Sequence, residues 1–179
     1  MASEFSYEFR VPKDRIAVII GTNGDTKNQL ERATRTKLNI DSQEAIVSIE
    51  GEDAVTLFTT REIIRAIARG FNPEVAQLLL KQDYGFDLVP LTDYAKSPED
   101  ALRLKGRVIG EGGKARKVIE DLTGSHLCVY GKTVGLIGEF ESLASARRAV
   151  ESLLSGSPHA TVYKWLERRR RELRKREYA

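Results

Sequence analysis

The chain has 179 residues, enough for one domain or two small ones, and 41% of them are hydrophobic and 31% charged. This composition can bury a core and excludes a disordered, collagen-like or disulfide-rich chain, and the single cysteine cannot form an internal disulfide. No apolar run approaches the roughly 18 residues of a membrane helix, and the polar segment MASEFSYEFR has no signal-peptide core. We therefore expect a soluble, cytoplasmic protein.

The charged residues are distributed unevenly along the chain. The formal net charge is +3, from 29 basic and 26 acidic residues, but residues 161–179 alone hold eight basic and three acidic residues. A nearly neutral body with a basic C-terminal segment predicts an anionic partner that is met at local patches. Charge by itself does not distinguish a nucleic acid from a membrane surface.

The first part of the chain predicts six elements in the order β-α-α-β-β-α. Alternating apolar residues indicate strands, and a 3.6-residue apolar period indicates helices. The elements are a strand over 5–11, a helix over 14–20, a helix from Asp25, strands over 37–40 and 46–49, and a helix over 53–69. We expect the strand to bury one side with Phe5, Tyr7, Phe9 and Val11, and the long helix to turn Val55, Phe58, Ile63 and Ile67 inward.

A connector over 72–85 with a short apolar helix over 74–80 comes next, and the same order of elements then recurs. Ser97 is a predicted N-cap, with Pro98 at the first helical position. The elements are a strand over 87–91, a helix from Pro98, a helix from Lys114, strands near Leu127 and Val134, and a helix over 141–154. A last helix over 160–174 has Val162, Trp165 and Leu166 as its apolar face.

The recurrence is an internal repeat. At a constant offset of 89 residues, Gly21 matches Gly110, Gly24 matches Gly113, and the pattern continues through the next helix to Leu38 and Leu127. Two residues fewer in the next loop bring Val47 onto Val134, and the last helix stays in phase with Ile63 over Val150. The predicted fold class is α+β, with two modules that each pack a three-stranded sheet on three helices. The predicted parts are a first domain over 1–71, a connector over 72–85, a second domain over 86–155 and a basic C-terminal helix over 156–179.

Each module carries a Gly-x-x-Gly loop between two helices. Such a loop presents backbone N–H groups at a helix N-terminus, where they and the helix dipole attract phosphate oxygens. Glycine allows close backbone approach and positive φ. One GxxG is also compatible with an ordinary helix-to-helix turn. Its occurrence twice, each time after isoleucine and before a helix and a strand pair, favours phosphate binding.

This pattern resembles the type I KH domain, whose GxxG loop clamps about four nucleotides of single-stranded RNA or DNA. By this resemblance the two clamps bind RNA, and the apolar residues before each loop and on the adjacent strand form a groove for bases. The clamp residues are Gly21, Thr22, Asn23 and Gly24 in the first module, and Gly110, Glu111, Gly112 and Gly113 in the second.

The two modules, the SPHATVYKWL stretch and the basic terminal helix together resemble one family over nearly the whole chain. It is the partner-of-Nob family of KH-domain small-subunit ribosome assembly factors, in its archaeal form. The resemblance implies binding of ribosomal RNA near the 3′ end of the small subunit. It also implies cooperation with the Nob endonuclease and association with the α subunit of initiation factor 2.

Basic residues near the loops are further candidate RNA ligands, and more of them surround the second loop. The carboxylate of Glu111 departs from the expected clamp, because it repels phosphate unless it points into solvent. The predicted ligands outside the loops are Lys27 in the first module and Arg107, Lys114, Arg116 and Lys117 in the second. Since phosphate neutralisation supplies much of the affinity for nucleic acids, we expect the second module to be the stronger site.

Other kinds of site fit the sequence poorly. Gly110-x-Gly112-x-x-Ala115 has the spacing of a dinucleotide fingerprint but lacks the long buried strand before it, and Lys114 is not followed by Ser or Thr as in a P-loop. His126 and Cys128 share a strand face without further metal ligands nearby. We predict a protein that is not an enzyme and needs no cofactor or metal.

Two alternatives remain open at the level of sequence. The Arg168–Arg171 run is either an RNA contact or a solvated helix face in which nearby glutamates pair with the arginines. The chain is either a ribosome assembly factor or a general single-stranded nucleic-acid-binding regulator of mRNA or translation.

Overall fold

The computed structural model describes residues 5–178, which form two compact units joined between Gln82 and Asp83. Residues 1–4 and 179, at the outer ends of the predicted first domain and C-terminal helix, lie outside the described residues. Within the described residues, no helix combines the length and the hydropathy needed to cross a bilayer.

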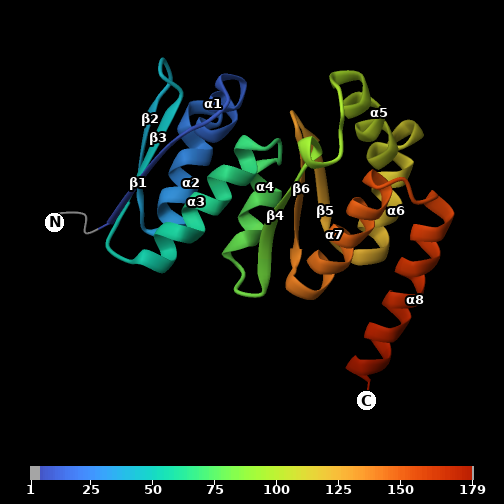
Figure 1. Ribbon diagram of the computed structural model, residues 1–179. Coiled ribbons are helices and arrows are strands. Elements are labelled where there is room, and N and C mark those ends of the chain that lie inside the picture. Colours follow the sequence, from blue (N-terminus) through green and yellow to red (C-terminus); the bar gives the residue numbers. More distant parts are fainter. Residues whose placement is uncertain (1–4, 179) are drawn as a thin grey trace. The chain divides into compact units, whose positions relative to one another are not determined.

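The first unit has the predicted order β-α-α-β-β-α, and its helices lie on one face of the sheet (Figure 1). Its elements are β1 (Phe5–Arg10), α1 (Lys13–Ile20), α2 (Asp25–Thr34), β2 (Lys37–Asp41), β3 (Ile46–Gly51) and α3 (Ala54–Ala68). The strands form an antiparallel sheet in the order β1-β3-β2, in which Ile49 faces Tyr7 on one side and Leu38 on the other. The connector helix is shorter than predicted, with α4 at Pro73–Ala76 and a 3-10 turn at Gln77–Leu80.

The second unit repeats this order and adds a terminal helix. Its sheet has the equivalent antiparallel order β4-β6-β5. Its elements are β4 (Tyr84–Pro90), a 3-10 turn (Leu91–Asp93), α5 (Pro98–Ile109), α6 (Lys114–Thr123), β5 (His126–Tyr130), β6 (Thr133–Glu139), α7 (Phe140–Leu154) and α8 (His159–Glu177). Strand β4 begins three residues earlier than predicted, because Tyr84 already pairs with Glu139 at the far end of β6. As predicted, the Ser97 hydroxyl caps α5 by accepting the N–H of Asp100, and Pro98 follows it.

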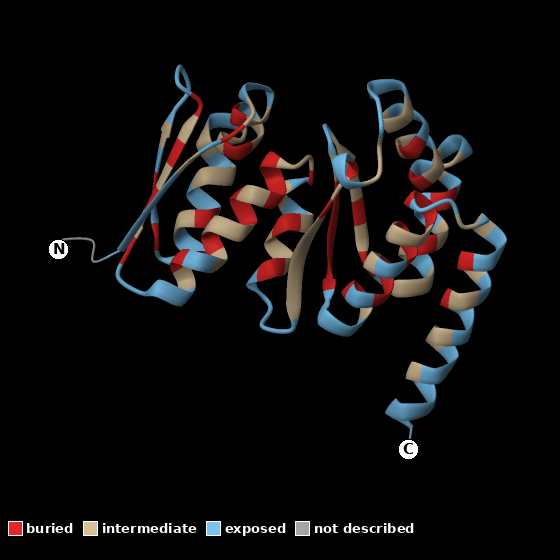
Figure 2. Cartoon of the chain, in the orientation of Figure 1, coloured by how far each residue is buried: buried red, intermediate tan, exposed pale blue. Residues whose placement is uncertain are grey.

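Repeat-equivalent residues build the two cores, and buried residues concentrate where helices face the sheets (Figure 2). Matched pairs that are at most 4% exposed include Ile19 and Val108, Leu30 and Ile119, Leu38 and Leu127, Val47 and Val134, and Ile63 and Val150. Each buried side chain of this size stabilises its fold by about 1.5–3 kcal/mol. The repeat detected in the sequence is therefore a repeat of core positions.

A carboxylate ties helix to strand at the same place in both units. Glu31 accepts the N–H of Leu38 at 2.7 Å, and Glu120 accepts the N–H of Leu127 at 2.8 Å. The matching glutamates therefore have a structural role: each fixes the helix that follows the GxxG loop to the first residues of the next strand.

The start of α3 and strand β1 differ from the prediction. Val55 is 72% exposed and Phe58 is 51% exposed, whereas Leu57, Ile63 and Ile67 are buried. Helix α3 is rotated so that its buried stripe runs through Leu57, and Val55 and Phe58 fall outside that stripe. Phe5 and Tyr7 are each 41% exposed because β1 is an edge strand, and Arg61 of α3 lies over the Tyr7 ring at 5.0 Å.

Helix α8 belongs to the core of the second unit. Val162 and Leu166 are buried in it, and Trp165 packs against it, as predicted from the apolar face. The start of α8 is also tied to α5, because Arg107 donates to the Ser157 carbonyl at 2.6 Å and His159 Nε2 lies 2.8 Å from the Arg107 carbonyl. The basic terminal segment is therefore an ordered part of the second unit.

Among the described residues, a buried hydroxyl before the second strand of each sheet has a partner in the first unit and none in the second, and this difference gives a prediction. Thr36 and Ser125 occupy matched positions before β2 and β5. Thr36 Oγ1 lies 2.8 Å from the hydroxyl of Thr34, whereas the buried Ser125 Oγ has no hydrogen-bond partner among the described residues. We expect Ser125→Ala to leave the free energy of unfolding unchanged or raise it by up to about 1 kcal/mol, and Thr36→Val to lower it by about 1 kcal/mol. Urea denaturation measures both, and a clear loss of stability in Ser125→Ala would contradict the assignment.

Candidate nucleic-acid interface

The two GxxG loops have one backbone conformation. Gly21 and Gly110 have φ/ψ of 78°/175° and 74°/171°, and Gly24 and Gly113 have 80°/11° and 77°/12°. In each loop the last glycine N–H donates to the first glycine carbonyl, at 3.3 Å in the first loop and 3.2 Å in the second. The resemblance between the loops is therefore one of three-dimensional shape as well as of sequence.

The first glycine of each loop is required by space as well as by φ. A Cβ on Gly21 would lie 2.6 Å from the backbone nitrogen of Thr26, and one on Gly110 would lie 2.6 Å from that of Ala115. Their φ/ψ values also lie in a region that is almost exclusive to glycine. These two glycines let the loop fold tightly onto the helix that follows.

The third position of each loop can hold a residue other than glycine. Asn23 and Gly112 both adopt the left-handed conformation, with φ of 54° and 58°. Asparagine is among the few residues that enter this region readily. A Cβ on Gly112 would meet nothing within 4 Å among the described residues. This position therefore accepts a side chain without disturbing the loop.

Each loop ends at an uncapped helix N-terminus. No side chain of the described residues caps α2 at Gly24 or α6 at Gly113. The N–H of Asp25 donates to the Thr22 carbonyl and the N–H of Lys114 donates to the Glu111 carbonyl, so an anion is attracted here by the positive end of the helix dipole. The first helical residue differs, since Asp25 places a negative charge at the first loop and Lys114 a positive charge at the second. The charge at the first helical position therefore disfavours an anion at the first loop and favours one at the second.

The structure divides the predicted basic ligands into two groups. Lys114 and Lys117 are exposed in the first turn of α6, and Arg116 lies beside them at 3.8 Å from Glu120. Lys27 is partly buried in the first turn of α2. The side chain of Glu111 is exposed in the second loop.

The guanidinium of Arg107 is engaged with the backbone of other segments and has a structural role. Its guanidinium donates to the carbonyls of Leu153 at 3.0 Å and Ser157 at 2.6 Å, so it joins α5 to the end of α7 and the start of α8. Arg103, one turn earlier on α5, pairs with Asp100 at 2.7 Å. The N–H of Lys96 and this guanidinium lower the pKa of Asp100. Fewer cations are therefore available at the second loop than the sequence indicates.

The surfaces beside the two loops differ in polarity. Ile109, the residue before the second loop, is 36% exposed and offers apolar surface to a base. In the first unit a depression between α2 and β2 is polar and contains the Asp41 carboxylate. Its lining is Lys27, Asn39, Ile40, Asp41, Ser42, Ile46 and Ser48. This depression is less apolar than the predicted base groove.

The described residues contain no group of three or more His, Cys, Asp and Glu side chains placed to hold a metal ion.

Arg148 of α7 was not identified from the sequence, and its guanidinium carbon lies over the Trp165 ring of α8 at 4.7 Å from its centre. The signal that could have indicated it is the repeat, because Arg148 matches Arg61, which stacks on Tyr7 in the first unit.

Both units match known domain families. Residues 6–69 match the KH domain, and residues 85–171 match the eukaryotic type KH domain, type I. The second match includes most of α8. The predicted fold class and the prediction of a non-enzymatic RNA-binding protein are confirmed by these families.

Three known proteins are similar over most of the chain. A KH domain-containing protein of Methanocaldococcus jannaschii is 44% identical over 170 residues, covering 93% of this chain and 74% of that protein. The RNA-binding protein PNO1 of Oryzias latipes is 29% identical over 136 residues, 75% of this chain and 56% of PNO1. A chain in the crystal structure of an a/eIF2alpha–aDim2p–rRNA complex from Pyrococcus horikoshii is 41% identical, with a TM-score of 0.88 over 94% of this chain and 95% of that one.

Proposed function

Since this chain belongs to the family of tandem KH-domain proteins that includes PNO1 and Dim2p, we propose that it is an RNA-binding factor of small ribosomal subunit biogenesis. It binds single-stranded ribosomal RNA near the 3′ end of the small-subunit RNA through its GxxG loops, and it works in the cytoplasm.

The observation that carries this proposal is the second GxxG loop at the uncapped N-terminus of α6. The positive end of the α6 dipole and the exposed side chain of Lys114 converge there on the place where a phosphate would lie. Ile109 adds apolar surface beside the loop for a base. A KH clamp of this kind holds about four nucleotides. Because Lys114 and Ile109 favour RNA at the second loop, the second unit supplies the main binding site.

The first unit is proposed as the weaker RNA site. Its loop has the same backbone, but Asp25 begins its helix and Asp41 lines the adjacent depression. Both carboxylates repel phosphate, and Lys27 offsets only part of their charge. Its groove is therefore better suited to limited contact with RNA than to independent tight binding.

Two protein partners are proposed. The archaeal complex contains a/eIF2alpha and rRNA together with aDim2p, which supports binding of the α subunit of initiation factor 2 by this chain as well. The family resemblance further implies cooperation with the Nob endonuclease. A scaffold that holds the RNA without cutting it fits a partner that supplies the nuclease activity.

Filter binding tests the RNA proposal. We expect RNA that matches the 3′ end of small-subunit rRNA from the same organism to bind at least about tenfold more tightly than a scrambled RNA of equal composition. Both affinities are measured at one fixed salt concentration, because the phosphate contribution depends on salt. Equal affinity for the two RNAs would support the alternative, a general single-stranded nucleic-acid-binding regulator.

A further inference from the structure

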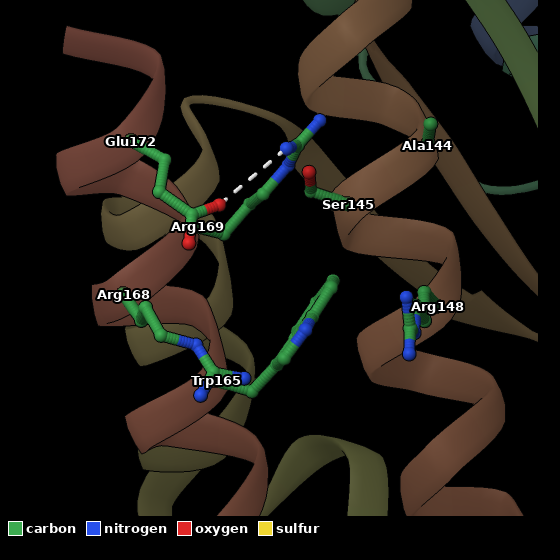
Figure 3. A pocket seen from close by; sticks show the side chains of 7 residues that line it. All are labelled: Ala144, Ser145, Arg148, Trp165, Arg168, Arg169 and Glu172. Atoms are coloured by element: carbon green, nitrogen blue, oxygen red, sulfur yellow. Dashed lines mark ion pairs between the residues drawn. The ribbon is translucent and has the colours of Figure 1, made fainter. Parts of the chain in front are cut away.

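A groove rich in basic residues runs between α7 and α8 of the second unit, and Figure 3 shows part of its lining. It consists of two adjoining hollows that share Arg148, Trp165 and Arg168 as lining residues. One hollow continues along Ser145 and Arg169, and the other along Thr161 and Lys164. In Figure 3 the Trp165 side chain lies between those of Arg148 and Arg168, and all three line both hollows. We call this surface the α7–α8 groove.

Arg148 is held in a form suited to an anion. Its guanidinium carbon lies 4.7 Å from the centre of the Trp165 ring, so one face of the guanidinium is covered. A stacked guanidinium keeps its N–H groups free at the edge, where they can bind a phosphate through two hydrogen bonds. The Trp165 ring itself is anchored against the core of the second unit.

One of the groove cations is paired with carboxylates, one of which, Glu172, also lines the first hollow, and the other three cations are not paired with a carboxylate among the described residues. Arg169 is 3.7 Å from Glu141 and 3.6 Å from Glu172. In contrast, no carboxylate of residues 5–178 lies within ion-pair distance of Arg148, Lys164 or Arg168. All three are exposed. Neighbouring like charges cost folding energy, and a bound polyanion removes that cost.

The positive charge continues along α8 in one direction. Lys164, Arg168, Arg171 and Lys175 follow one another at helical spacings of four, three and four residues, so they lie along one face. At about 1.5 Å rise per residue, successive cations are about 4.5–6 Å apart along the helix axis. A regular row of this kind matches a chain of phosphates better than it matches the irregular carboxylates of a protein surface.

The groove begins close to the helix that carries the clamp. Ser157, one of its lining residues, accepts a hydrogen bond from Arg107 at 2.6 Å. The Arg107 carbonyl lies 2.8 Å from His159 at the start of α8. Gly110, the first residue of the second loop, follows Arg107 by three residues. RNA held in the second loop therefore has a basic surface at the same end of the unit on which to continue.

We propose that the α7–α8 groove binds the phosphodiester backbone of RNA that extends beyond the second GxxG loop. This inference rests on the proposed RNA-binding function and adds a second contact surface to it. Arg148 and Arg168 hold phosphates on either side of Trp165, and Lys164, Arg171 and Lys175 attract the adjoining backbone. The groove lengthens the site without reading bases, because it contacts phosphates.

An RNA length series tests the groove. A 5-nucleotide RNA fills only the clamp, whereas a 12-nucleotide RNA with the same core also reaches the groove. We expect Arg148→Gln/Arg168→Gln to weaken binding of the longer RNA about tenfold and to make its salt slope shallower by about 1.4, for two lost phosphate contacts. Binding of the shorter RNA should stay within about twofold of wild type, because the clamp is intact.

The matched control is Arg61→Gln/Arg65→Gln on α3, the repeat counterpart of α7, which also removes two charges. Circular dichroism and the thermal midpoint confirm that each variant is folded. The proposed role of the α7–α8 groove in RNA binding is rejected if the groove variant binds the longer RNA with unchanged affinity, or if Arg61→Gln/Arg65→Gln loses as much affinity. A groove variant that binds RNA normally but no longer binds the α subunit of initiation factor 2 assigns the groove to a protein partner instead. If wild type binds neither RNA, the proposed function fails together with this inference.

Discussion

Gly110→Ala is expected to destabilise the second unit by about 3 kcal/mol, a large fraction of the stability of a small domain. The φ/ψ of 74°/171° is almost exclusive to glycine, and an added Cβ would lie 2.6 Å from the Ala115 nitrogen and 2.7 Å from its Cβ. Both groups belong to the first turn of α6, which Ile119 and Glu120 fix to the core and to β5. The loop cannot yield without moving that helix, so we expect RNA binding to be lost as well.

The matched control is Gly112→Ala in the same loop. Its φ of 58° lies in the left-handed region, but its Cβ would meet nothing within 4 Å among the described residues. The expected cost is therefore about 1–2 kcal/mol. Urea denaturation of both variants measures the difference. Equal losses would mean that the close approach of the loop to Ala115 does not restrict position 110.

Gly112→Asp is expected to reduce RNA affinity at least about tenfold while the protein remains folded. The side chain fits, but its carboxylate would lie at the proposed phosphate position beside the N-terminus of α6. Two like charges 4 Å apart repel by about 1 kcal/mol in water and about 4 kcal/mol at the effective dielectric constant of a protein surface. A loss of 1.4 kcal/mol corresponds to about tenfold in affinity.

Gly112→Asn isolates the charge, because asparagine has nearly the same shape as aspartate and already occupies the matched position, Asn23, at a φ of 54°. We expect this variant to keep most of the wild-type affinity in filter binding. Asn23→Asp makes the equivalent change in the first unit and should have a smaller effect, because Asp25 and Asp41 already disfavour phosphate there. Equal losses for Gly112→Asp and Gly112→Asn, or a larger loss for Asn23→Asp, would contradict this ranking of the two loops.

Apolar periodicity and the internal repeat made the fold predictable from sequence. The periodicity predicts the order β-α-α-β-β-α and the repeat shows that it occurs twice, each time with a GxxG loop, whereas the family was identified by resemblance; the comparisons confirm the family and the fold. This succeeded because the matched apolar positions, such as Leu30 with Ile119, are buried in both units. Two independent occurrences of one pattern also support an interpretation that a single GxxG could not.

The tertiary contacts of individual side chains could not be predicted from the sequence. Arg107 lies three residues before the second loop and was predicted to bind RNA, but its guanidinium reaches Leu153 and Ser157, which are distant in the chain. The inward positions of Val55 and Phe58 were wrong for a related reason. Helical periodicity gives an apolar face, but the neighbours of α3 decide which of two overlapping faces is buried.

Local spacing thus determined the elements, the paired loops and most of the repeated core positions of this protein, because backbone hydrogen bonding and apolar periodicity act over a few residues. Tertiary structure alone decided which cations are available to a ligand. Arg103 and Arg107 are engaged with Asp100 and with backbone carbonyls, while Arg148 meets Trp165 from a different helix. Whether a cation is free to bind a ligand depends on partners a few ångströms away in space, and those partners lie as far as 50 residues away in the chain.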